Sequence, residues 1–184
     1  MVFGRCTIIR RTSLSEFPLI RSYRPADWAA VWSIIRPVFR AGETYAIPTD
    51  IAEADAHRLW IEAPAATYVA QDDGGRVLAT YYIKANHPGP GSHVCNCGYI
   101  VDRSARGQGL ASDLCGHSQT VAVELGFRAM QYNLVVATNQ GALRVWRRHG
   151  FEIVGTLPGA FQHPELGDVD AHVLYKSLMS GMGS

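Results

Sequence analysis

Apolar and polar positions along the chain follow two periods, which predict an alternating series of strands and helices. Helical spacing is clearest at Val31, Ile34, Ile35 and Val38, and again between residues 109 and 125. An apolar stripe of this kind is typical of a helix that packs one face on a sheet. Asp27 can cap the first of these helices, and Pro37 is expected to end or kink it before Phe39. Three further helices are expected over residues 50–61, 109–125 and 139–148.

Strands are predicted where short apolar runs lie between turn residues. The Asp-Asp-Gly-Gly sequence at 72–75 is a strong hairpin signal. The apolar run at 130–136 is typical of a strand buried on both faces. The expected strands cover residues 19–24, 67–70, 76–84, 94–101, 130–136, 151–157 and 171–175.

The resulting order β-α-α-β-β-β-α-β-α-β-β contains no internal repeat and no linker. It favours an α/β (α+β) domain, with a mixed sheet and helices on both of its faces. A chain of 184 residues is long enough to bury a core of its own. We expect an N-terminal extension over residues 1–18, one domain over 19–178 and a flexible tail over 179–184.

Composition and charge exclude several classes of protein. The formal net charge is +1, from 17 basic and 16 acidic residues, so the chain has no broad basic face for nucleic acid. No apolar run approaches the roughly 18 residues of a membrane span, and no secretory signal is evident. These features, together with unpaired cysteines, predict a cytoplasmic protein.

His93, Cys95 and Cys97 form a His-x-Cys-x-Cys pattern that raises the question of a metal site. No second cysteine or histidine pair supplies further ligands at a familiar spacing. Residues two apart share one face of a strand, and free cysteine packs as a small apolar residue. We therefore expect buried thiols and no metal.

The segment from Arg106 to Ala111, Arg-Gly-Gln-Gly-Leu-Ala, joins a predicted strand to a long predicted helix. Its glycines allow a ligand to approach the backbone closely, and the free N–H groups of the first helical turn favour an anion. The segment lacks both the Lys-Ser/Thr ending of a triphosphate-binding loop and the spacing of a dinucleotide-binding fold. A diphosphate fits it, although a plain glycine-rich turn remains the alternative.

Arg106-x-x-Gly109-x-Ala111 after Ile100-Val101 resembles motif A of the GNAT N-acetyltransferase superfamily, and the stretch from Asn139 to Phe151 resembles its motif B. The resemblance implies the GNAT fold, with six or seven mostly antiparallel strands and a splay between the fourth and fifth. It also implies acetyl-CoA as cofactor, with its pantetheine arm beside Ile100 and Val101. The cofactor-binding residues implied are Ile100, Val101, Arg106, Gly107, Gln108, Gly109, Leu110, Ala111, Asn139, Ala142 and Trp146.

Several blocks of the C-terminal half resemble the yeast azetidine-2-carboxylate N-acetyltransferase group more closely, among them residues 82–86, 92–99, 133–140 and 169–171. Members of that group acetylate small cyclic imino acids related to proline. The resemblance implies that Asn96 and Asn133 bind the acceptor and that Asn139 binds the cofactor. The N-terminal half matches less, beyond the Gly42-x-Thr44-Tyr45 pattern, from which we take Thr44 as a further candidate.

The reaction implied is direct attack of a neutral amine on the thioester, without a covalent intermediate. We predict that a backbone N–H near Val101 stabilises the oxyanion. Glu43 is a candidate for orienting or deprotonating the amine, although a solvated loop charge is an equal reading. Many family members have a tyrosine at the position of Trp146, and that tyrosine acts as the general acid that protonates the leaving thiolate. The indole N–H of Trp146 cannot serve as a general acid.

Two classes of function remain open at this point. The first is a small-molecule N-acetyltransferase for an amino or cyclic imino acid, or for a different amine such as an antibiotic or a peptide N-terminus. The second is a non-catalytic acyl-CoA sensor, which Trp146 favours and which Asn96 and Asn133 disfavour. A homodimer is possible in either case.

Overall fold

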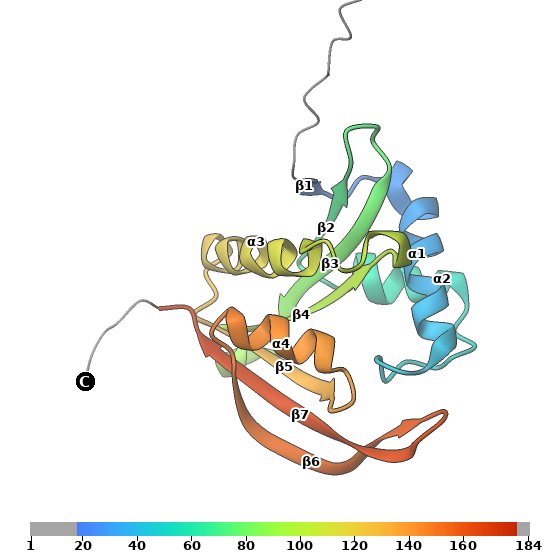
Figure 1. Cartoon of the computed structure of the whole chain (residues 1–184). Coiled ribbons are helices and arrows are strands. Elements are labelled where there is room, and N and C mark those ends of the chain that lie inside the picture. Colours follow the sequence, from blue (N-terminus) through green and yellow to red (C-terminus); the bar gives the residue numbers. More distant parts are fainter. Residues whose placement is uncertain (1–17, 180–184) are drawn as a thin grey trace, which may run out of the picture.

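The structure is a computed structural model that describes residues 18–179. Its strands and helices follow the predicted order (Figure 1). The helices are α1 (Trp28–Ala41), α2 (Glu53–His57), α3 (Leu110–Glu124) and α4 (Gln140–Arg148). The strands are β1 (Leu19–Ser22), β2 (Ala66–Gln71), β3 (Val77–Ala85), β4 (Val94–Val101), β5 (Ala129–Val136), β6 (Glu152–His163) and β7 (Gly167–Ser177). The predicted extension and tail fall almost entirely outside the described residues.

All seven strands belong to one sheet, in the order β1-β2-β3-β4-β5-β7-β6. Neighbouring strands are antiparallel except β4 and β5, which are parallel. The parallel pair arises because α3 carries the chain back across the sheet before β5 begins. The predicted mixed, mostly antiparallel sheet is therefore confirmed.

Two hydrophobic clusters lie on opposite faces of this sheet. α1 and α2 cover one face and α3 and α4 the other (Figure 1). Trp60, in the π-helical turn Arg58–Glu62 that follows α2, is fully buried at the centre of the first cluster. Leu114 and Trp146 join the second cluster from α3 and α4. The sheet therefore separates two cores, and a ligand inserted between two of its strands would contact residues of both cores.

The first helix does not end at Pro37, so the expected helix end there, one of the two outcomes predicted, was wrong. α1 continues to Ala41 and closes on Gly42, whose φ of 66° gives a left-handed C-cap. Pro37 lies on the exposed side, where its ring faces solvent. Phe39, two residues later, is fully buried and packs its ring against Tyr45 and Trp60. The burial of this large side chain offsets the hydrogen bond that proline removes.

The other differences concern element lengths. α2 is shorter than expected because the chain passes into the π-helical turn at Arg58, and β6 and β7 are longer than expected. The two strands form a hairpin that extends past β5 (Figure 1), with exposed positions along most of β6. An apolar pattern cannot reveal strand residues that are not buried. Within residues 18–179, no helix is long and apolar enough to cross a membrane.

Candidate functional site

A gap between β4 and β5 forms the centre of the candidate site. The two strands pair only at Val94–Ala129 and Cys95–Met130, and then diverge. Asn96 spans the start of this gap, because its side-chain amide donates a hydrogen bond of 2.9 Å to the carbonyl of Gln131. A cavity of about 830 Å³ opens beyond it, lined by both strands, by the start of α3 and by α4. The predicted splay is therefore present.

The start of α3 presents free backbone N–H groups to this cavity. Gly107 and Gly109 both have positive φ, 78° and 87°, which only glycine adopts without strain. A Cβ atom at either position would meet no atom of the protein, because the space beside them is open. The first bond of the helix runs from the N–H of Ser112 to the carbonyl of Gly109, so the N–H groups of Leu110 and Ala111 precede it. These residues line the cavity.

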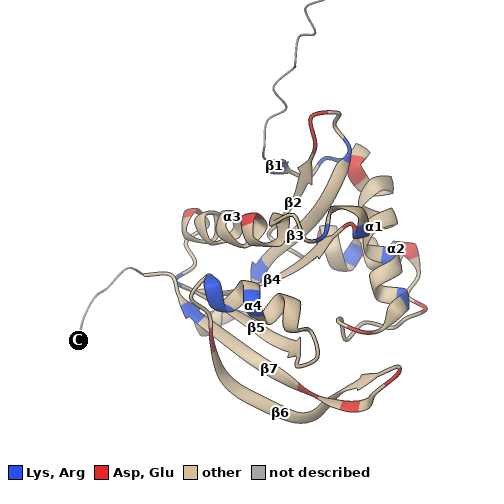
Figure 2. Ribbon diagram, in the orientation of Figure 1, with Lys and Arg blue, Asp and Glu red and all other residues tan. Residues whose placement is uncertain are grey.

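Basic side chains surround the same end of the cavity. Arg106 lines it from the loop before α3, and Arg144 and Arg148 line it from α4, a helix whose basic residues are visible in Figure 2. No Asp or Glu of the described residues lines the cavity. Asp102 holds the loop in place by accepting hydrogen bonds from the hydroxyl of Ser104 and, at 2.8 Å, from its N–H, and these bonds lower the pKa of the Asp102 carboxyl. The arrangement suits an anion at the start of α3.

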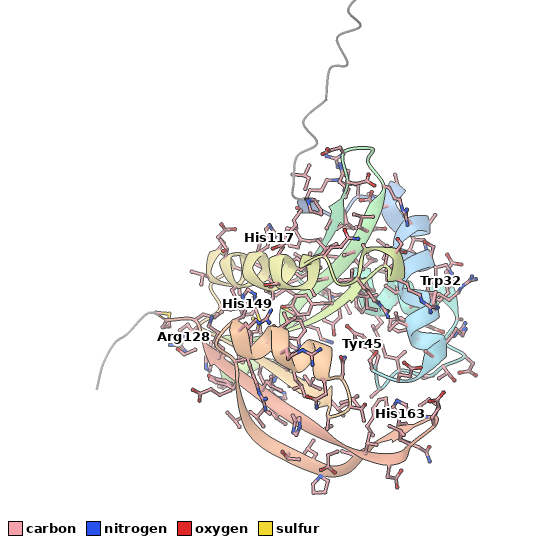
Figure 3. The ribbon with its side chains drawn as sticks, viewed as in Figure 1. Trp32, Tyr45, His117, Arg128, His149 and His163 are labelled. Carbon is pink, nitrogen blue, oxygen red and sulfur yellow. The ribbon has the colours of Figure 1, made fainter. Side chains whose placement is uncertain are left out.

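The peptide groups of β4 alternate between β3 and the gap. The N–H of Asp102 bonds to the carbonyl of Leu78 on the β3 side, so the peptide N–H and C=O of Val101 point the other way. The same alternation directs those of Tyr99 and Cys97 into the gap. Tyr45, in the loop after α1, reaches across and donates its hydroxyl to the carbonyl of Tyr99 at 2.9 Å (Figure 3). Burial raises the pKa of Tyr45 well above its usual range.

Aromatic side chains close the cavity on the α3 and α4 side. The ring of Trp146 lies 4.9 Å from that of Tyr99 and 5.0 Å from that of Tyr132. The Tyr99 hydroxyl in turn contacts Ser118 Oγ at 2.7 Å and the Tyr132 hydroxyl at 2.9 Å. Burial raises the pKa of both tyrosines well above 10. These groups therefore stay protonated and form a fixed wall.

On the α1 and α2 side, the cavity ends against β3. Tyr82 lies opposite Gly98, and Lys84 lies opposite Asn96. A Cβ atom on Gly98 would lie 2.6 Å from Cε1 of Tyr82, so only glycine lets this ring lie flat over β4. The Tyr82 ring is also held from behind by Trp60, whose ring centroid is 4.8 Å away. Both Tyr82 and Lys84 line the cavity.

Asn133 lies on the opposite side of the gap, in β5. The pairing of β5 with β7 shifts register between Tyr132 and Val135, a β-bulge of the kind often found beside active sites. Asn133 donates to Asn86 Oδ1 at 2.6 Å and accepts from Gln131 at 3.0 Å. Asn133 thus lies within the bulge, and it lines the cavity.

The structure brings most of the predicted site residues together. The following line the cavity: Thr44, Asn96, Ile100, Val101, Arg106, Gly107, Gly109, Leu110, Ala111, Asn133, Asn139, Ala142 and Trp146. Asn139 also caps α4, accepting a hydrogen bond of 3.1 Å from the N–H of Ala142. Glu43 and Gln108 are exposed and lie outside the lining.

Sequence reasoning missed Tyr82, Lys84 and Ser112, which also line the cavity. Ser112 contacts His149 Nε2 at 2.7 Å between α3 and α4 (Figure 3), and burial lowers the pKa of this histidine. Ser112 has no motif of its own, and the resemblance over residues 82–86 assigned no role to Tyr82 or Lys84. The available signal was the antiparallel pairing of β3 with β4 across the connection at residues 86–93, which places Lys84 opposite Asn96.

The cysteines of the His-x-Cys-x-Cys pattern are buried, as predicted. Burial raises the pKa of the Cys97 thiol well above its usual value. Among the described residues, no group of three or more His, Cys, Asp or Glu side chains is placed to hold a metal ion.

Comparison with known proteins identifies the family. The model of the acetyltransferase (GNAT) family matches residues 28–151. The N-acetyltransferase aca1 of Schizosaccharomyces pombe is 37% identical over 98 residues, which are 53% of this chain and 47% of that protein. The chain thus spans about half the length of this curated relative.

Solved structures agree over nearly the whole domain. A GCN5-related N-acetyltransferase from Kribbella flavida has 38% identity and a TM-score of 0.84, covering 88% of this chain and 98% of that one. A phosphinothricin acetyltransferase from Sinorhizobium meliloti, solved with acetyl-CoA, has 20% identity and a TM-score of 0.80, covering 91% of this chain and 92% of that one. At that identity it shows a shared fold. The chain belongs to the acetyltransferase (GNAT) family, whose members use acetyl-CoA.

Proposed function

We propose that this protein transfers the acetyl group of acetyl-CoA to the amine of a small amino acid or cyclic imino acid. The observation that carries the proposal is the continuous cavity between β4 and β5. It has an anion site at the start of α3 and amide side chains, Asn96 and Asn133, farther along the strands. The similarity to an N-acetyltransferase and the resemblance to the azetidine-2-carboxylate group support this acceptor class.

The residues at the α3 end fit acetyl-CoA. In our proposal the diphosphate binds the N–H groups of Gly107 to Ala111, with Arg106 beside it, and the helix dipole adds to the attraction. The gap-facing peptide groups of Val101 and of the β5 edge leave room for the pantetheine arm as an added strand, beside which Ile100 also lines the cavity. Asn139, Ala142 and Trp146 line the α4 wall of the same space. The bound molecule supplies the thioester that the amine attacks.

The spacing along β4 refines the position of the oxyanion donor. Val101 lies five residues after Asn96, which corresponds to about 16 Å in an extended strand. An amine held near Asn96 therefore cannot reach a carbonyl bound to the N–H of Val101. We propose that Val101 pairs with the pantetheine arm, and that the gap-facing N–H of Tyr99 or Cys97 stabilises the oxyanion.

The side chains at this end favour direct attack without a covalent enzyme intermediate. Burial keeps the Cys97 thiol protonated, so it is a poor nucleophile. Burial also raises the pKa of Tyr82 to about 12, and that of Tyr45 well above its usual range. Both phenols act as hydrogen-bond donors near neutral pH and not as bases. The walls thus position the two substrates and exclude water. Glu43 is exposed at the rim. We propose that, if it acts as the base, it takes the proton of the amine through a water molecule.

Release of free CoA with a panel of amines tests this function. The panel contains azetidine-2-carboxylate, proline, primary amino acids, an aminoglycoside, phosphinothricin and a peptide with a free N-terminus. We expect acetyl transfer to be fastest with the cyclic imino acids. A preference for the peptide or for an antibiotic would contradict the proposed amino or imino acid acceptor, but it would not contradict the fold or the cofactor site.

The second candidate is a sensor that binds acyl-CoA without chemistry. Trp146 favours it, because an indole replaces the tyrosine that many relatives use as an acid. Tight binding of acetyl-CoA with no release of CoA for any amine would support the sensor. A cytoplasmic location and a homodimer remain predictions under either function.

A further inference from the structure

Lys84 is a cation at the end of the cavity that lies away from the anion site of α3. It lies on β3 directly opposite Asn96, and both side chains line the cavity. Arg106, by contrast, lies at the level of Val101, where its Nε is 3.4 Å from the Val101 carbonyl. The two levels are about 16 Å apart in an extended strand. Lys84 and Arg106 therefore face different parts of any molecule that fills the cavity.

The ammonium group of Lys84 has no carboxylate partner within residues 18–179. The ion pairs of that region use other residues, and none of its Asp or Glu side chains lines the cavity. The contact that Lys84 does make is with the face of Tyr82, whose ring centroid lies 5.4 Å from Nζ. This cation–π contact stabilises the charge without using a hydrogen-bond acceptor. The N–H donors of Lys84 remain for a ligand.

The cation–π contact with Tyr82 also orients the Lys84 side chain. Tyr82 lies two residues before Lys84 on the same face of β3, opposite Gly98. The ammonium is therefore drawn from the level of Asn96 toward that of Gly98. There it lies near the stretch of β4 whose gap-facing N–H groups we assign to the oxyanion. A positive charge at this point suits an anion attached close to the reacting nitrogen.

We propose that Lys84 binds the carboxylate of the acceptor and sets the preference of the protein for amino and imino acids over simple amines. The inference rests on the proposed function, because it takes the acceptor to lie at this end of the cavity. An amino or imino acid carries a carboxylate on the carbon next to its nitrogen. A carboxylate placed in the cavity beside Tyr82 needs a charged or hydrogen-bonding partner to offset its desolvation. Lys84 and Asn96 are those partners.

Calorimetry on protein saturated with CoA tests the inference without turnover. Azetidine-2-carboxylate is titrated into the wild type, Lys84→Met and Lys84→Arg. Methionine keeps the apolar stem over Tyr82 and removes the charge, and we expect it to weaken binding about 10- to 100-fold, as for a lost hydrogen bond to a charged group. Arginine keeps the charge and is expected to retain most of the affinity. Arg36→Met removes an exposed charge of α1 outside the cavity and serves as the matched control.

Equal affinity of the wild type and Lys84→Met would overturn the inference, as would the absence of any binding to the wild type. Binding that depends on Lys84 but leads to no acetylation would support it and contradict the proposed function instead. A kinetic comparison of azetidine-2-carboxylate with its carboxamide adds a second readout. The ratio of kcat/KM for acid over amide is expected to fall about 10-fold or more in Lys84→Met, and an unchanged ratio would contradict the inference.

Discussion

Replacing Gly109 with valine is expected to weaken acetyl-CoA binding by about 100-fold, as for losing one or two hydrogen bonds to a charged diphosphate. Gly109 has a φ of 87° and an open side toward the cavity, so the new side chain would occupy the space assigned to the diphosphate. A β-branched residue also resists this backbone conformation and would turn the first N–H groups of α3 away. Calorimetric titration with acetyl-CoA measures the effect.

Gly126→Val is the matched control for this substitution. Gly126 follows the other end of α3, has a φ of 84° and likewise has no atom within reach of a Cβ. It imposes the same kind of backbone strain but lies outside the cavity lining. Similar losses of acetyl-CoA affinity in the two variants would show that strain alone explains the effect. An unchanged dissociation constant in Gly109→Val would refute the diphosphate site.

Replacing Trp60 with alanine is expected to lower the free energy of unfolding by about 3–5 kcal/mol. Trp60 is fully buried, and its ring packs edge-on against Phe39, Tyr45 and Tyr82. Its indole N–H also donates to Thr80 Oγ1 at 3.1 Å, so truncation leaves both a cavity and a lost hydrogen bond. Urea denaturation followed by circular dichroism measures the change.

Trp32→Ala removes the same indole from a partly exposed position, where it stacks on Trp28. We expect that variant to lose about 1 kcal/mol or less. Trp60→Ala should also raise the acceptor KM more than the acetyl-CoA dissociation constant. The reason is that Trp60 supports Tyr45 and Tyr82, whereas the start of α3 packs in the cluster on the other face of the sheet. Equal losses of stability in the two tryptophan variants would contradict this account of the core.

The helices and strands that were predicted best from the sequence are those that are buried and bounded by glycine or by a capping residue. The strand at 94–101 and the helix capped by Asn139 agree with the structure, because apolar periodicity and a capping residue are both local signals. The helix end expected at Pro37 was wrong because the helix continues to bury Phe39 against Tyr45 and Trp60, which are distant in sequence. The exposed parts of β6 and β7 were missed because hydrogen-bonded pairing, and not an apolar face, holds them in the sheet.

The cofactor end of the site was more predictable than the acceptor end. Arg106 to Ala111 form one contiguous segment, so their chemistry can be read from a short stretch of sequence. The acceptor end combines Tyr45, Tyr82, Lys84 and Asn96 from three separate segments, and only the β3–β4 register brings the last three together. Glu43 seemed a good candidate from its glycine-flanked loop, yet the structure leaves it exposed at the rim.

A crystal structure of the protein soaked with acetyl-CoA tests the central claim most directly. The account predicts a diphosphate within hydrogen-bond distance of the N–H groups between Gly107 and Ala111. It also predicts the pantetheine arm between β4 and β5, with the thioester carbonyl facing Tyr99 or Cys97. A diphosphate bound at another place, or an empty gap at saturating acetyl-CoA, would contradict it.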